Sequence, residues 1–225
     1  MKNKTVVFDL DGTFIDTAPD IIDSLNHCLL HAGMAPANEH DIANFVGHGG
    51  RVMIARAFEV QKRELAESLH DKLLELFLEH YRANIPGRSV PFEGAVEALA
   101  QLRNAGFRTA ICTNKFESLS VALIDALGLR INFDAICGSD TYPFRKPDPR
   151  HLTKTIEAAG GTTACALMVG DSQTDINTAK AAGIPVVAVD FGYSAEHVSA
   201  FAPTHIISRY DELTPDLADR LIGGK

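Results

Sequence analysis

Two aspartates at the end of an apolar stretch are the first residues whose types and spacing suggest chemistry. Asp9 and Asp11 close the β-rich run Thr5–Leu10, and Gly12 follows them. Side chains at positions i and i+2 of an extended chain point the same way, so the two carboxylates can converge on one spot. Adjacent carboxylates repel each other unless a cation or a shared proton compensates them. The pattern suggests a cation site, although a turn rich in Asp and Gly that merely ends a strand has the same composition.

A second acidic pair, Asp171 and Asp175, comes after the apolar run Ala166–Val169. These residues also have a purely structural interpretation, since Asp171 or Ser172 can cap a helix and Asp175 suits its first turn. Carboxylate oxygens are the ligands that Mg²⁺ prefers, however. We therefore expect Asp171 to join the N-terminal pair at one metal site.

Polar and cationic residues occupy two further places of the same kind. Thr113 and Asn114 stand at the end of the β-rich run Thr109–Thr113, where a hydroxyl can hydrogen-bond an anion. Lys146 stands within Arg145–Pro149, and the prolines stiffen the loop that would hold its charge. The plain alternatives are an ordinary strand end and a solvated loop lysine.

A glycine-rich segment, Gly47–Arg51, precedes a helical pattern that starts at Val52. Gly49 and Gly50 allow the backbone to approach a ligand or to turn sharply. Arg51 can bind a carboxylate through two parallel hydrogen bonds. The segment lacks the Lys of a Walker loop and the preceding strand of a dinucleotide fingerprint. A flexible turn between two helices is the alternative interpretation.

Strands and helices that alternate along the chain must position these residues. Such alternation predicts a parallel sheet with helices on both faces. In an open sheet of this kind, ligands bind at the carboxyl ends of the strands. The expected strands are Thr5–Leu10, Thr109–Thr113, Phe133–Cys137, Ala166–Val169, Pro185–Val189 and His205–Ile207, and the expected helices are Ala95–Asn104, Ser118–Leu127, Pro149–Ala159 and Thr174–Ala182.

One region departs from this alternation. From Pro19 to Asn84 the pattern predicts helices without a strand, and Leu65–Tyr81 carries apolar residues at helical spacing. The segment Ile85–Pro91 has the composition of a linker. We therefore expect an all-helical insert after the first strand, from which the chain returns to the sheet.

Composition narrows the function classes. The 225 residues include 21 Lys and Arg and 29 Asp and Glu, which gives a formal net charge of −8. A net acidic surface repels phosphate backbones, so we expect no nucleic acid partner. No apolar run approaches the roughly 18 residues of a membrane span, and we expect neither a membrane partner nor a signal peptide. The four cysteines form no Cys-x-x-Cys pair and are expected to be buried thiols of a cytoplasmic protein.

The order of the four polar segments and their placement at strand ends resemble the motifs of the haloacid dehalogenase superfamily, in its phosphatase branch. The resemblance covers nearly the whole chain. Within that superfamily, the segments Val7–Thr13, Thr113–Lys115 and Lys146–Pro149 are most similar to those of phosphoglycolate phosphatases. The resemblance implies a doubly wound, Rossmann-like α/β core domain with an inserted helical cap domain. The core would span residues 1–14 and 88–225, and the cap residues 15–87.

The same resemblance implies Mg²⁺-dependent hydrolysis of a small phosphomonoester, with 2-phosphoglycolate the first choice, by a cytoplasmic monomer or homodimer. A sugar-phosphate mutase of the β-phosphoglucomutase type is a rival, although Asn114–Lys115 differs from the small residues of those enzymes. A pyrophosphatase, a nucleotide phosphatase and a non-catalytic binding protein on the same scaffold also stay open.

The resemblance further implies a role for each site residue. Asp9 would attack phosphorus and form an aspartyl-phosphate. Asp11 would protonate the leaving group and then take a proton from water, a step that a dehalogenase does not need. Mg²⁺ would be held by Asp9, the backbone carbonyl of Asp11, and Asp171. Asp175 would not bind the ion directly but would lie in the shell around the ion or around Lys146. Lys146 would stabilise the phosphoryl oxygens. The candidate substrate-binding residues are Thr113, Asn114, Gly12, Gly49, Gly50 and Arg51.

Overall fold

A central parallel sheet organises the molecule. The structure is a computed structural model that describes residues 4–38 and 43–224. Within these residues the main sheet has six strands in the order β5-β4-β1-β6-β7-β8, and every neighbouring pair is parallel. The strands are β1 (Thr5–Phe8), β4 (Arg108–Cys112), β5 (Ala135–Cys137), β6 (Ala166–Gly170), β7 (Val186–Val189) and β8 (His205–Ile207).

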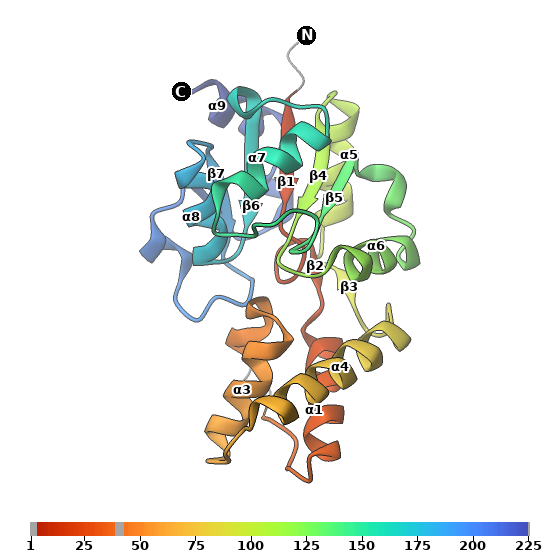
Figure 1. The fold of residues 1–225 in the computed structure, drawn as a ribbon. Helices are drawn as coiled ribbons and strands as arrows, with labels where there is room; N and C mark the ends of the chain where they lie inside the picture. Colours follow the sequence, from red (N-terminus) through yellow and green to blue (C-terminus); the bar gives the residue numbers. More distant parts are fainter. Residues whose placement is uncertain (1–3, 39–42, 225) are drawn as a thin grey trace.

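Helices cover both faces of this sheet (Figure 1). Alternate side chains of β1 separate the two faces, because Val6 and Phe8 belong to one hydrophobic cluster and Val7 to another. The first cluster includes side chains of α5 (Ala95–Asn104), α6 (Glu117–Ala126) and α9 (Pro215–Gly223). The second includes side chains of α7 (Pro149–Ala158) and α8 (Gln173–Ala181). The predicted doubly wound α/β fold is confirmed.

A helical segment lies beyond the carboxyl ends of the strands, while both chain termini lie at the opposite end of the sheet (Figure 1). The segment contains η1 (Ala43–His48), α1 (Ala18–His31), α3 (Gly50–Val60) and α4 (Glu67–Ala83). Its helices share a hydrophobic cluster that includes Leu25, Met53 and Phe77. The cluster agrees with an insert that packs on its own core, and the division into core and cap at residues 15 and 87 stays a prediction.

The connection between sheet and helical segment is more ordered than a linker composition suggests. β2 (Ile15–Asp16) pairs antiparallel with β3 (Val90–Pro91), so the outgoing and returning chains form a short ribbon. Asp20 accepts hydrogen bonds from the backbone N–H groups of Arg88 and Ser89 at 2.7–3.0 Å and from the Ser89 hydroxyl at 2.5 Å. The two chain crossings are therefore joined to each other as well as to the sheet.

The expected elements are present, with ends that shift by one or two residues. β1 stops at Phe8, so Asp9 is the first residue beyond the strand. β5 begins at Ala135, two residues later than expected, and a short 3₁₀ turn at residues 130–132 precedes it. The C-terminal helix α9 was not expected from the sequence pattern.

The four cysteines are free and buried, as predicted. Among the described residues, no helix combines the length and the apolar character that a membrane span requires.

Candidate active site

The loop after β1 brings the first aspartate to the edge of the sheet. The backbone N–H of Asp9 still bonds to the carbonyl of Val169 on β6 at 2.9 Å, and the chain then turns away. Gly12 adopts φ +79°, and a Cβ there would lie 2.7 Å from an Asp171 oxygen and 2.7 Å from the Tyr193 ring. Glycine is therefore required at this position both by conformation and by space. Its small size lets the loop pack against Asp171.

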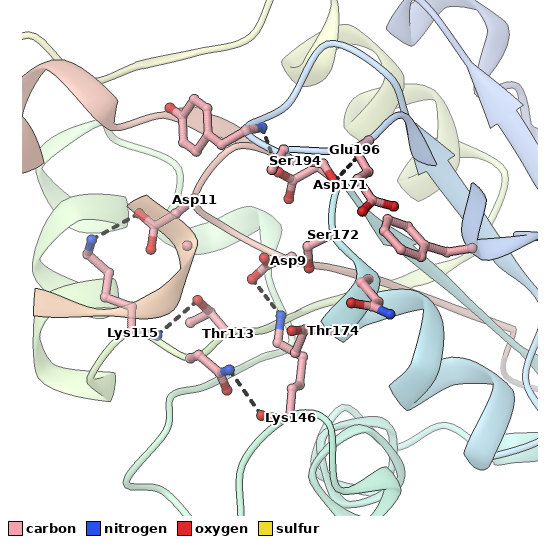
Figure 2. Close-up of a pocket in the computed structure, with 16 residues that line it drawn as sticks. Asp9, Asp11, Thr113, Lys115, Lys146, Asp171, Ser172, Thr174, Ser194 and Glu196 are labelled. Carbon is pink, nitrogen blue, oxygen red and sulfur yellow. Dashed lines mark hydrogen bonds and ion pairs between the residues drawn. The ribbon is translucent and has the colours of Figure 1, made fainter. Parts of the chain in front are cut away.

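A buried lysine joins two of the predicted site aspartates. Lys146 Nζ lies 2.8 Å from Asp9 Oδ1 and 2.6 Å from Asp175 Oδ1, and its side chain is 2% exposed. Burial alone would lower the pKa of Lys146, but Asp175 and Asp9 outweigh it and raise the pKa above its usual value. The ammonium is therefore a fixed positive charge beside Asp9 (Figure 2).

Three buried carboxylates gather around this lysine. Oxygens of Asp9, Asp171 and Asp175 lie within 4.8 Å of one another. Burial, followed by the neighbouring Asp175 and Asp171, raises the pKa of Asp9 to about 8 despite Lys146. Burial and Asp175 raise the pKa of Asp171 to about 6. With all three ionised, Lys146 leaves two negative charges uncompensated, so the donor set and the charge balance fit a divalent cation.

Two hydrogen bonds orient Asp171 toward this cluster. The Thr13 hydroxyl donates to Asp171 Oδ1 at 2.8 Å, and the backbone N–H of Tyr193 donates to Oδ2 at 2.9 Å. The Ser172 hydroxyl caps α8 in a capping box with Asp175. Ser172 therefore caps the helix, as one interpretation of this acidic segment predicted. Asp171 lies at the same time in the group of carboxylates that could hold a metal ion.

Asp11 lies in a different environment from the other carboxylates. Its Oδ1 lies 2.9 Å from Lys115 Nζ and accepts the Thr17 hydroxyl at 2.7 Å. Figure 2 shows this second ion pair apart from the pair of Asp9 and Lys146. Asp11 is outside the group whose carboxylate oxygens converge, and the predicted use of its backbone carbonyl as a metal ligand stays a prediction.

The end of β4 supplies the uncharged polar side of the site. The Thr113 hydroxyl accepts the backbone N–H of Lys115 at 3.2 Å, and Asn114 Nδ2 donates to the carbonyl of Lys146 at 3.0 Å. Thr113 and Asn114 both line the same cavity as Asp9. The asparagine therefore ties the loop of Lys146 to the end of β4.

A cavity of about 190 Å³ opens over these groups. Its lining joins strand-end residues to a segment that the sequence analysis did not single out, around Tyr193 and Glu196. Tyr193 also donates from its hydroxyl to Asp16 at 2.6 Å and accepts the N–H groups of Thr17 and Ala18. The place of this segment in the sequence indicates that it lies near the site, because it follows the predicted strand Pro185–Val189 and so must reach the same edge of the sheet.

The glycine-rich segment of the helical insert contributes differently from the aspartates. Gly47 lines the cavity, whereas Gly49, at φ +90°, and Gly50 start α3. Arg51 pairs with Glu67 at 3.0 Å and with Asp71, both on α4, and it is absent from the cavity lining among the described residues. The structure thus gathers Asp9, Asp11, Gly47, Thr113, Asn114, Lys146 and Asp171 at one cavity. The predicted contacts of Gly12, Gly49, Gly50 and Arg51 with substrate stay predictions.

Comparisons with known proteins agree with this arrangement. The chain is 60% identical over 222 residues to the phosphoglycolate phosphatase of Mesorhizobium japonicum, a match that covers 99% of this chain and 98% of that one. It is 47% identical to the phosphoglycolate phosphatase of Agrobacterium fabrum, with coverage of 96% and 93%. A crystal structure described as a predicted phosphoglycolate phosphatase from Haemophilus somnus superposes with a TM-score of 0.87 at 27% identity, and the match covers 100% of this chain and 99% of that one.

A family model described as haloacid dehalogenase-like hydrolase matches residues 6–189, which include the strand-end aspartates and both site lysines. The sheet order, the acidic cluster and this match over most of the chain lead to one assignment: the chain belongs to the haloacid dehalogenase-like hydrolase family.

Proposed function

We propose that this hydrolase is a phosphatase that cleaves small phosphomonoesters through a covalent intermediate on Asp9, with 2-phosphoglycolate as its substrate. Family membership and the names of the two bacterial relatives support phosphatase activity and this choice of substrate. The observation that carries the proposal is the contact of Asp9 with Lys146 inside a cluster of acids that fits a divalent cation.

In the first step an Asp9 oxygen attacks phosphorus, and the bond between phosphorus and the ester oxygen breaks. A carboxylate needs no separate base to act as a nucleophile once it is ionised. The positive charge of Lys146 favours the ionised form of Asp9. A divalent cation held by the acidic cluster would favour it further, because it would compensate the neighbouring carboxylates. Lys146 and the Thr113 hydroxyl then stabilise the phosphoryl oxygens as charge moves onto them.

Asp11 carries the proton in this scheme. It gives a proton to the departing alkoxide, which leaves as an alcohol. In the second step it takes a proton from the water that attacks the aspartyl-phosphate, and the bond between phosphorus and Asp9 breaks to release inorganic phosphate. Its position at the cavity, outside the group formed by Asp9, Asp171 and Asp175, supports this separate role.

We propose Mg²⁺ as the cation. The residues that would hold it are Asp9, Asp171 and the backbone carbonyl of Asp11, with Asp175 holding Lys146 in place beside them. When bound, the ion supplies charge that offsets the repulsion between the carboxylates and the phosphate dianion. The hydrogen bonds of Thr13 and Tyr193 to Asp171 orient one of these ligands in advance.

A panel of phosphomonoesters assayed with Mg²⁺ tests the proposal, and 2-phosphoglycolate should show the highest kcat/KM. Acid-quenched protein should carry one additional phosphoryl group on the peptide that contains Asp9. Asp9→Asn should abolish turnover, because an amide does not attack phosphorus, and such losses commonly reach several orders of magnitude. The matched control Asp125→Asn changes an exposed aspartate on α6 and should keep parent activity. If Asp9→Asn kept more than about a tenth of the parent rate, Asp9 would not be the nucleophile.

A further inference from the structure

Two cations line the cavity among the described residues, and they have different partners. Lys146 contacts both Asp9 and Asp175, so it belongs to the phosphoryl side of the site. Lys115 contacts Asp11, the residue on the leaving-group side, at 2.9 Å. The site therefore has one ammonium for each end of a substrate that carries negative charge at both ends.

Lys115 is buried between the sheet and the helical segment, where neighbouring groups fix its position. Its side chain is 8% exposed, and its Nζ lies 4.3 Å from the centre of the Tyr81 ring on α4. The Thr113 hydroxyl fixes its backbone N–H. An ammonium has three N–H donors, so Lys115 can bind a substrate carboxylate and keep its contact with Asp11. A buried, pre-positioned cation loses little conformational freedom when a ligand binds.

The chemistry of the leaving group places its carboxylate close to this ammonium. In 2-phosphoglycolate the carboxylate is attached to the carbon that bears the ester oxygen. Asp11 must lie within hydrogen-bond reach of that oxygen to protonate it. The cation in direct contact with Asp11 therefore faces the part of the substrate that carries the carboxylate.

We propose that Lys115 binds the carboxylate of the leaving group and makes this phosphatase selective for phosphomonoesters of small hydroxy acids. The inference rests on the proposed function, because it assumes that Asp11 faces the ester oxygen. Arg51, which the sequence suggested as a candidate carboxylate-binding residue, is paired with Glu67 and Asp71 on α4.

The test compares 2-phosphoglycolate with ethyl phosphate, which has a methyl group in place of the carboxylate. Lys115→Met removes the charge and keeps most of the length of the side chain. For this variant, the loss in kcat/KM relative to the parent should be about ten- to a hundredfold greater on 2-phosphoglycolate than on ethyl phosphate, as expected for a lost charged hydrogen bond. Lys115→Arg should keep part of the selectivity, because it keeps the charge.

Three controls make the result specific. Lys4→Met removes a lysine that pairs with Asp219 and precedes β1, at the end of the sheet opposite to the site, and it should leave both activities unchanged. Arg51→Ala should leave the ratio of the two activities unchanged. Turnover of ethyl phosphate shows that each variant is folded. If Lys115→Met did not fold, Lys115→Arg, which keeps the charge, would be compared with Lys115→Gln, which loses it, and only Lys115→Gln should lose the preference for 2-phosphoglycolate.

Two outcomes would overturn the assignment, and they differ from each other. Equal losses on both substrates in Lys115→Met would show that Lys115 serves only Asp11, while the proposed function would stand. A parent enzyme with no preference for the carboxylated ester would refute the proposed substrate, and the role of Lys115 in recognising it would fall with it.

Discussion

The cluster of buried carboxylates makes the stability of the metal-free protein depend on pH, and Asp9→Asn should remove the part of this dependence that comes from Asp9. Burial and the neighbouring acids raise the pKa of Asp9 from an ordinary 3.8 to about 8. Between these two values the folded protein binds a proton at Asp9 that the unfolded chain has released. The contribution of Asp9 to the free energy of unfolding is therefore most favourable at low pH and falls as the pH rises through this range.

The size of the effect follows from the number of protons. A difference of one bound proton changes the free energy of unfolding by about 1.4 kcal/mol per pH unit. Asparagine does not titrate, so the stability of Asp9→Asn relative to the parent should rise by up to about 3 kcal/mol from pH ~5 to pH ~7. Lys146 keeps its contact with Asp175 in the variant, which limits the cost of the substitution itself.

Urea unfolding in EDTA at several pH values measures this difference directly. Asp125→Asn, on the exposed face of α6, is the matched control and should show a difference from the parent that does not change with pH. Saturating Mg²⁺ should stabilise the parent and flatten its pH dependence, because a bound cation keeps the carboxylates ionised. A stability difference between Asp9→Asn and the parent that is constant across this pH range would refute the description of Asp9 as a carboxylate destabilised by its buried neighbours.

Three further predictions concern the metal, the connection between the sheet and the helical segment, and the glycine-rich segment. EDTA should stop phosphatase activity and Mg²⁺ should restore it, and Ca²⁺ should substitute poorly because its coordination is larger and looser. Asp171→Ala should raise the Mg²⁺ concentration needed for half-maximal activity. Full activity in metal-free protein would contradict the assignment of Mg²⁺. Tyr193→Phe removes the hydroxyl that bonds Asp16, Thr17 and Ala18, so the free energy of unfolding in urea should fall by about 1–3 kcal/mol; an unchanged value would show that these bonds do not stabilise the connection between the sheet and the helical segment. Arg51→Ala should lower the thermal midpoint slightly through lost pairing with α4, with no selective loss of 2-phosphoglycolate turnover; a selective loss would favour the carboxylate role expected from the sequence.

Local patterns were sufficient to predict the sheet and the edge on which the site lies. Runs of β-branched and apolar residues identify the strands, since a parallel strand is buried on both faces. The residues that directly follow such runs must emerge at one edge of the sheet. For this reason Asp9, Thr113 and Asp171 could be placed together from the sequence, and all three line the cavity.

The side chain to which each polar group binds could not be predicted in the same way. The resemblance implied that Lys146 acts near Asp9, but no sequence pattern indicated that Asp11 would pair with Lys115, 104 positions away. The Tyr193 hydroxyl reaches Asp16 across 177 positions. Such contacts depend on how two loops and the helical segment pack. The residue types involved are also common in turns without a site, so they do not indicate these contacts by themselves.

The partners of Arg51 show the same limit, and its contact with a substrate carboxylate stays a prediction. A basic residue after a glycine-rich segment satisfies the chemical requirement for a carboxylate-binding group, and its sequence context says nothing about competing partners. Glu67 and Asp71 lie on another helix, and only the packing of α3 against α4 brings them to the guanidinium. The sequence by itself determined the fold class, the strand-end aspartates and the chemistry open to them, because hydrophobic periodicity and residue type are local properties. The tertiary structure decided which cation faces which acid, because charges pair through space and a charged side chain binds the nearest partner that packing brings to it.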